Sequence, residues 1–188
     1  LIALAAREET ERKQAGLARV RDDQGDPAMG DPDAAITLYE FSDYNCGYCT
    51  RVFEPIQQML RDNRGVRLVI KEFPILSQSS LVAAQAAIAA EMQGKFADYH
   101  IGMMTYRGQI TNDVVMRVAE QAGLDHTQLQ KDMESAETAA IIQRTREAAA
   151  ALALYGTPAL VIGDTVLPGA ICLDELVGLI ADERAKQG

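Results

Sequence analysis

Two cysteines, Cys46 and Cys49, are the residues of this sequence best suited to chemistry, and only Gly47 and Tyr48 separate them. A strand-like segment precedes the pair and a helical pattern follows it, so the pair stands at a helix start. A spacing of three residues puts both sulfurs on one side of the first turn, at a separation that a disulfide accepts. Free backbone N–H groups at that end favour a thiolate. The pattern predicts thiol–disulfide exchange, with Cys46 as the nucleophile and Cys49 as the resolving thiol.

Two other uses of a cysteine pair fit this sequence less well. A structural zinc site needs four ligands, and beyond the pair the sequence offers only Cys172, His100 and His126. An inert disulfide over so short a spacing closes a small loop and gives little stabilisation. We therefore predict no metal and no cofactor besides the redox-active Cys46–Cys49 disulfide. Cys172 is expected to be a small buried filler, and the two histidines are expected to be surface or packing residues.

Length, charge and hydropathy exclude several classes of protein. The chain has 188 residues, a net charge of -9 and 48% hydrophobic residues, which fits one globular domain with or without an inserted subdomain. The acidic balance argues against a nucleic-acid partner. No apolar run reaches the roughly 18–20 residues that cross a bilayer. Because the sequence starts at Leu1, we expect that a signal peptide has already been removed.

The residues around the cysteine pair predict the elements that position it. A buried strand over 35–41, a helix over 50–63 and a strand over 66–73 form a β-α-β unit with parallel strands. Apolar spacing and capping residues then predict five helices, a β-hairpin and a last helix. These are expected over residues 80–93, 96–105, 111–121, 125–133, 137–154, 159–162 with 165–167, and 173–186.

Two segments precede the first strand. Residues 1–22 are rich in Ala, Glu, Arg and Gln and predict a helix whose middle is charged on every side. Such a helix is marginal on its own, so it is either a frayed tail or a stalk through which copies of the chain associate. Residues 23–34 combine glycines, prolines and aspartates, a composition that predicts a linker.

Three phrases of the sequence resemble the thioredoxin superfamily, and most closely its DsbA branch. They are Glu40-Phe41-Ser42-Asp43-Tyr44-Asn45-Cys46-Gly47-Tyr48-Cys49, Lys71-Glu72-Phe73-Pro74-Ile75-Leu76 and Gly156-Thr157-Pro158-Ala159. Within that branch the chain is similar to the ScsC-like (suppressor of copper sensitivity) group of disulfide isomerases. The resemblance implies an α/β thioredoxin-like fold, a central mixed sheet flanked by helices over 35–74 and 137–188. It also implies an inserted all-helical subdomain over 75–136.

The resemblance also implies roles for residues outside the cysteine pair. Thr157 and Pro158 match the family's cis-proline loop, where the Thr157 backbone would pair with an extended client segment. Glu40 shares one strand face with apolar residues. Beneath Cys49 it would have a raised pKa and relay the proton of that thiol. Lys71 is expected to pair with Glu40. The alternative is a surface pair of little consequence.

The dipeptide between the cysteines departs from the best-known oxidant of the family, which has a histidine before its second cysteine. Tyr48 occupies that place and cannot become cationic, so we expect weaker thiolate stabilisation and a milder oxidant. Tyr48 also offers an aromatic rim to an unfolded client. Gly47 is expected to support the same motif.

These observations lead to one functional hypothesis and one alternative. The hypothesis is a periplasmic protein thiol–disulfide oxidoreductase that forms or isomerises disulfides in unfolded or misoxidised secreted proteins and exchanges electrons with a membrane redox partner. It would act as an isomerase if the N-terminal helix joins several copies into a homo-oligomer. The alternative is a non-catalytic thiol scaffold, either a holdase or a copper-binding module.

Overall fold

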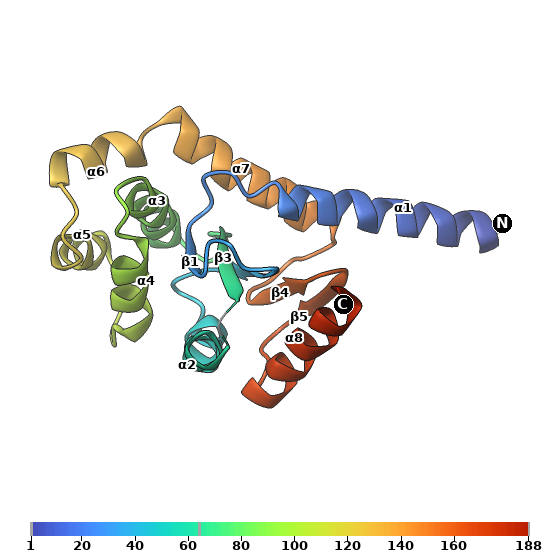
Figure 1. Cartoon of the computed structure of the whole chain (residues 1–188). Coiled ribbons are helices and arrows are strands. Elements are labelled where there is room, and N and C mark those ends of the chain that lie inside the picture. Colours follow the sequence, from blue (N-terminus) through green and yellow to red (C-terminus); the bar gives the residue numbers. More distant parts are fainter. Residues whose placement is uncertain (1, 64, 188) are drawn as a thin grey trace.

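The fold is built on a five-stranded mixed sheet with helices on both faces (Figure 1). The computed structural model describes residues 2–63 and 65–187. Residues 1, 64 and 188 lie outside that description, so the first residue of the helix expected over 1–22 and the last residue of the domain expected over 137–188 are not described. The strands, in the order β1-β3-β2-β4-β5 across the sheet, are Ala28–Gly30, Val66–Glu72, Ile36–Ser42, Ala159–Ile162 and Thr165–Pro168. The α/β fold expected from the sequence is confirmed.

Eight helices lie in the described part of the chain, and their positions follow the capping residues closely. Thr111, Asp125 and Ser135 cap helices with their side chains, and each accepts a hydrogen bond from a backbone N–H of the first turn. The helices are α1 Ile2–Arg21, α2 Gly47–Asp62, α3 Gln78–Met92, α4 Phe96–Thr105, α5 Asn112–Gln121, α6 His126–Met133, α7 Ala136–Ala151 and α8 Leu173–Gln187. None of these helices, among the residues described, is long and apolar enough to span a membrane.

The central strands β2 and β3 run parallel, and their register decides which side chains share a face. Glu40 aligns with Ile70, Phe41 with Lys71, and Ser42 with Glu72. Alternate residues project to opposite faces. One face packs against α2 and α8, where Leu38, Leu68, Ile56 and Leu176 are buried together. The other face packs against α1 and α7, where Tyr39, Phe41, Val69, Leu17 and Ala148 are buried together.

The chain between β3 and α7 folds as α3, α4, α5 and α6, which gather at one end of the sheet (Figure 1). Ala-rich α3 is buried along most of its length, and α4 packs beside it through Phe96 and Tyr99. Helix α7 begins beside α3, where Ile141 and Ile142 contact Ala84 and Ile88. It then continues along the sheet to α1, so one continuous helix joins the helical segment to the sheet.

The segment expected to be a linker is part of the folded core. Ala28–Gly30 forms β1, an edge strand antiparallel to β3, and Asp26 is 3% exposed. A three-residue strand among glycines, prolines and aspartates carries no period-2 signal. The prediction of a linker over 23–34 was therefore wrong for residues 26–30.

Helix α1 is divided between a docked base and a projecting end. Leu17 and Val20 are fully buried against α7 and the sheet. At Gly16 a Cβ would lie 2.5 Å from Leu152 Cδ2, so glycine permits the close approach of α1 to the end of α7. Residues 6–15 are exposed, and this part of α1 extends away from the domain (Figure 1).

Candidate active site

The two cysteines lie at the start of α2, as their spacing predicts. Cys46 is the residue before the helix, and the backbone N–H of Cys49 donates to Cys46 Sγ at 3.4 Å. Both are free thiols in this structure. Cys46 is 6% exposed and Cys49 is fully buried. The helix end favours a negative charge on Cys46, whereas burial and the charge of Glu40 raise the pKa of the Cys49 thiol.

The loop that precedes β4 brings Thr157 and Pro158 against Cys46. Cys46 Sγ–H donates to the carbonyl oxygen of Thr157 at 3.3 Å, and the Thr157–Pro158 peptide bond is cis. A groove of about 640 Å³ opens beside this contact. Its lining includes the side chains of Tyr48 and Tyr155, which are 58% and 84% exposed. An apolar surface therefore adjoins Cys46.

Glu40 lies on the α2 face of the sheet, beneath the cysteines. It is 2% exposed, and its Oε1 atom has no hydrogen-bond partner among the described residues. Burial raises the pKa of Glu40 to about 7, and the nearby Ser42 hydroxyl acts in the opposite direction. A carboxyl group with such a pKa can accept or return a proton at neutral pH.

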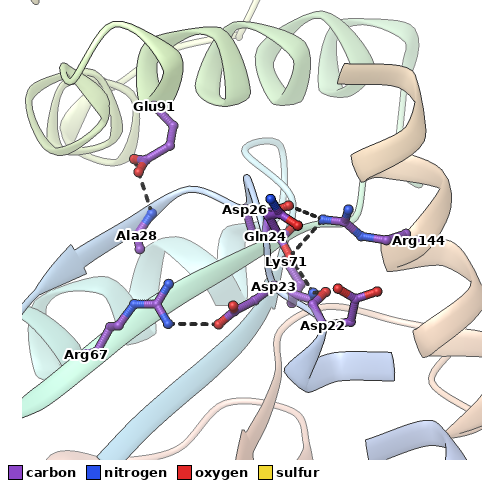
Figure 2. A network of polar contacts seen from close by, with 9 residues as sticks. All are labelled: Asp22, Asp23, Gln24, Asp26, Ala28, Arg67, Lys71, Glu91 and Arg144. Carbon is purple, nitrogen blue, oxygen red and sulfur yellow. Dashed lines mark hydrogen bonds and ion pairs between the residues drawn. The ribbon is translucent and has the colours of Figure 1, made fainter. Parts of the chain in front are cut away.

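Lys71 does not pair with Glu40, so that prediction was wrong. Because Glu40 aligns with Ile70 and Lys71 with Phe41, the two charged side chains point to opposite faces of the sheet. Lys71 Nζ instead lies 2.5 Å from Asp26 Oδ2, and both side chains are fully buried. Figure 2 shows this network, with Arg144 reaching in from α7.

The Lys71 network fastens the segment between α1 and β1 to the sheet. Lys71 Nζ also donates to the carbonyl of Asp22, and Arg144 donates to the carbonyl of Gln24 at 2.5 Å. Arg67 on β3 pairs with Asp23 at 2.8 Å. These contacts lie on the face away from the cysteines, so they hold the fold together and take no part in the site.

Three polar residues of the site escaped the sequence analysis. Asp43 Oδ2 accepts hydrogen bonds from the backbone N–H groups of Ile75 and Leu76, which ties the cysteine loop to the loop after β3. Tyr44 Oη donates to Glu72 Oε1 at 3.3 Å. Asp43, Tyr44 and Glu72 all stand within the two quoted motifs, but their contacts join separate loops, and no local spacing indicates them.

Gly47 and Tyr48, the two residues between the cysteines, are both exposed. A Cβ at Gly47 would meet no atom, so the space in front of this exposed residue is open. The Arg51 guanidinium lies 4.7 Å from the centre of the Tyr48 ring, which places a cation beside the aromatic rim.

The third cysteine and the two histidines differ in burial. Cys172 is exposed, so the expectation of a buried filler was wrong. His126 is exposed at the start of α6. His100 is a packing residue, 1% exposed, between the rings of Tyr44, Phe53 and Phe96.

The site and the fold together are those of a thioredoxin-like thiol–disulfide oxidoreductase. A family model described as the DSBA-like thioredoxin domain matches residues 37–181, and the chain belongs to this family. A thioredoxin-like oxidoreductase from Silicibacter pomeroyi DSS-3 is 37% identical, with a TM-score of 0.84 over 90% of this chain and 97% of that one. The catalytic domain of Proteus mirabilis ScsC is 26% identical, with a TM-score of 0.83 over 93% and 98% of the two chains.

Other relatives place the same domain in two contexts. A periplasmic thioredoxin-like protein from Salmonella enterica serovar Typhimurium is 27% identical, with a TM-score of 0.82 over 91% of this chain and 97% of that one. Curated relatives include Na(+)/H(+) antiporters NhaA of Salinispora tropica and Mycolicibacterium gilvum, 27% and 31% identical over 73% and 78% of this chain. The matched regions are 21% and 24% of those antiporters, so this chain spans about a quarter or less of their length.

Proposed function

We propose that this protein exchanges disulfides with unfolded or misoxidised secreted proteins in an oxidising compartment, the bacterial periplasm. The observation that carries the proposal is the position of Cys46 Sγ, at the start of α2 and 3.3 Å from the Thr157 carbonyl. A sulfur at a helix start is stabilised as a thiolate. The similarity to a periplasmic thioredoxin-like protein of Salmonella enterica supports the compartment.

The exchange proceeds through a mixed disulfide between Cys46 and the client. Cys46 thiolate attacks a client disulfide, a Cys46–client S–S bond forms, and the other client sulfur leaves with the electron pair. Cys49 then gives its proton to the Glu40 carboxylate and attacks Cys46 Sγ. The Cys46–Cys49 bond forms, the Cys46–client bond breaks, and the client cysteines end reduced. The reverse sequence oxidises a client dithiol.

Client binding is assigned to the groove beside Cys46. The Thr157 backbone lies at its edge, where an extended segment can add as a strand. The exposed rings of Tyr48 and Tyr155 offer apolar contact to unfolded chains. Neither surface selects a particular side chain, which suits a protein that acts on many clients.

The choice between oxidase and isomerase depends on α1 in this proposal. An isomerase of this kind needs several active sites around one client, and the exposed part of α1, residues 6–15, is available to join copies of the chain. A membrane redox partner would keep Cys46 and Cys49 reduced in an isomerase, or oxidised in an oxidase.

The test is the reactivation of a scrambled-disulfide substrate by the reduced protein. Cys46→Ala is expected to abolish reactivation, while Cys172→Ala, which removes the exposed third thiol and leaves the Cys46–Cys49 pair intact, is expected to retain it. Reactivation by both variants would contradict the proposal. Stoichiometric Cu(I) uptake by the reduced protein, without reactivation, would favour the copper-binding alternative.

A further inference from the structure

A second carboxyl group, Glu72, is buried on the same face of the sheet as Glu40. Ser42 aligns with Glu72 across the parallel pair β2–β3, and Glu40 lies two residues before Ser42 on the same face. Diagonal neighbours on adjacent strands are within reach of long side chains. Glu40, Ser42 and Glu72 are 2%, 2% and 1% exposed, so two carboxyl groups and a hydroxyl share one buried patch.

Each of these three side chains has a polar atom that no described group satisfies. The atoms are Glu40 Oε1, Ser42 Oγ and Glu72 Oε2. A buried polar atom without a partner is costly, and three such atoms in one patch are unusual. Their chemistry is complementary, because a protonated carboxyl donates, a hydroxyl both accepts and donates, and a carboxylate accepts.

Among the described residues, the titratable groups that act on Glu40 and Glu72 include no cation. Burial raises the pKa of Glu72, and the negative charge of Asp43 in the β2–α2 loop adds to that effect. From α4, His100 Nδ1 lies 2.9 Å from Tyr44 Oη, and burial lowers the pKa of His100 to about 3. Asp26, on the other face of the sheet, also raises the pKa of Glu72. The Tyr44 and Tyr99 hydroxyls and the Cys49 thiol are neutral acids at neutral pH.

A buried carboxyl beside other acids and without a cation keeps its proton. Tyr44 Oη already donates to Glu72 Oε1, which leaves Glu72 Oε2 as the oxygen that carries the proton. A neutral His100 with its proton on Nδ1 can donate to Tyr44 Oη, and this completes the set of donors on that side. The Glu72 proton then needs an acceptor. Ser42 Oγ is a neighbouring oxygen that has no hydrogen-bond partner among the described residues.

We propose that Glu72 stays protonated through the reaction and that Glu72 Oε2–H donates to Ser42 Oγ, whose hydroxyl donates to Glu40 Oε1. These two hydrogen bonds stabilise the Glu40 carboxylate, which then accepts the proton of Cys49. Glu72 and Ser42 are positioning residues, because they act on the thiol only through Glu40. The inference rests on the proposed function, in which Glu40 receives that proton.

The test follows the Cys49 step alone. A mixed disulfide between Cys46 and a chromophoric aromatic thiol is prepared, and release of that thiol by Cys49 is timed across pH. In the wild type the rate rises with pH, with a midpoint near the pKa of Glu40, about 7. Glu40→Gln removes this limb of the profile, which shows that the limb reports Glu40.

Ser42→Ala and Glu72→Met each break the chain of donors and are expected to move the midpoint upward. A hydrogen bond to a charged group corresponds to a shift of about one pH unit, or about a tenfold slower release below the midpoint. The double variant moves it no further than either single one, because both act through the same contact. Glu72→Gln keeps a donor and restores the midpoint to within about half a unit.

The outcomes separate the inference from the proposed function. A limb that persists in Glu40→Gln overturns the inference and the role of Glu40 as proton acceptor, whereas the exchange itself is overturned only by reactivation that survives in Cys46→Ala. A limb that is lost in Glu40→Gln but unmoved in Ser42→Ala and Glu72→Met overturns only the inference. A downward shift in Glu72→Gln also overturns it, because Glu72 would then act as a charge. The exposed carboxyl of Glu54 on α2 gives the matched control, and Glu54→Gln is expected to leave the midpoint in place.

Discussion

The two faces of the central sheet bury acidic side chains in opposite ways. On the face of α1 and α7, Asp26 is buried against Lys71, with Arg144 nearby. On the face of α2, Glu40 and Glu72 are buried without any cation among the described residues that contact them. The first cluster is a set of ion pairs that ties a chain segment to the sheet. In the second, burial raises the pKa of each acid, and no cation among the described residues offsets that effect.

The difference shows how burial can serve structure on one face and chemistry on the other. Burial raises the pKa of Asp26 as well, but there Lys71 and Arg144 act in the opposite direction, and removal of Lys71 would leave the Asp26 carboxylate without its main partner. A buried carboxyl without a partner destabilises the fold when it ionises, and its pKa moves towards neutral pH. The cysteines lie over the second face, where a proton acceptor is needed.

The largest expected effect on the comparison comes from Lys71→Met. This change strands the Asp26 carboxylate and is expected to lower the free energy of unfolding by about 3–5 kcal/mol. Denaturant unfolding measures it. Lys71→Met/Asp26→Leu, which removes both charges, should regain most of the loss. If Lys71→Met instead shifted the pH profile of the Cys49 step, the two faces would not be separate.

Glu40→Gln tests the other face. The pKa of Glu40 is raised from 4.5 to about 7 in the folded protein. Between these values the folded state binds more protons than the unfolded state, so stability falls as pH rises through the interval. The variant lacks this fall. It should match the wild type near pH 4 and be more stable by about 3 kcal/mol at pH 8, by denaturant unfolding. Equal stability at both values would contradict the account.

Much of this comparison could be foreseen from the sequence, but not the division between faces. The spacing of Cys46 and Cys49 at a helix start indicates their place, and the resemblance of the Thr157 loop to the family's cis-proline loop implies its place. The face of Glu40 followed from alternation along one strand. Lys71 was assigned to the wrong face because the register between β2 and β3 depends on packing, which no single strand reveals.

Longer-range contacts explain the other misses. Asp26 lies in a segment whose composition indicates a linker, and only its buried partner on β3 reveals β1 as part of the sheet. Tyr44 meets His100 across 56 residues, and a local pattern carries no signal for such a contact. Cys172 stands beside an apolar helix start, but it lies on the exposed side.

Gly16→Val tests whether the docked part of α1 stabilises the face of the sheet on which Asp26 pairs with Lys71. The new side chain would overlap Leu152 at the end of α7, and overpacking is expected to cost about 1–3 kcal/mol. Thermal or denaturant unfolding measures the loss. An unchanged free energy of unfolding would mean that the packing of α1 against α7 contributes little to stability, and that the ion pairs of the Lys71 network stabilise this face without it.

Arg19→Ala gives the smallest effect. Arg19 pairs with Glu147 at 3.2 Å, but the two side chains are 55% and 48% exposed. Exposed pairs contribute little, so the variant should lose less than about 1 kcal/mol of stability. A double-mutant cycle with Glu147→Ala measures the pair itself. A coupling as large as that of Lys71 and Asp26 would contradict the role given to burial.

The most direct test of the account is the titration of the Glu40 carboxyl in the reduced protein. NMR of protein labelled at the glutamate carboxyl carbon follows it, with the signal assigned by its absence in Glu40→Gln. We expect the Glu40 carboxyl to titrate with a midpoint near pH 7, because it is buried without a cation among the described residues. The midpoint is expected to be the same in Lys71→Met. A midpoint near 4.5, the ordinary value, would contradict the central claim that this face of the sheet holds an unpaired proton acceptor beneath the cysteines.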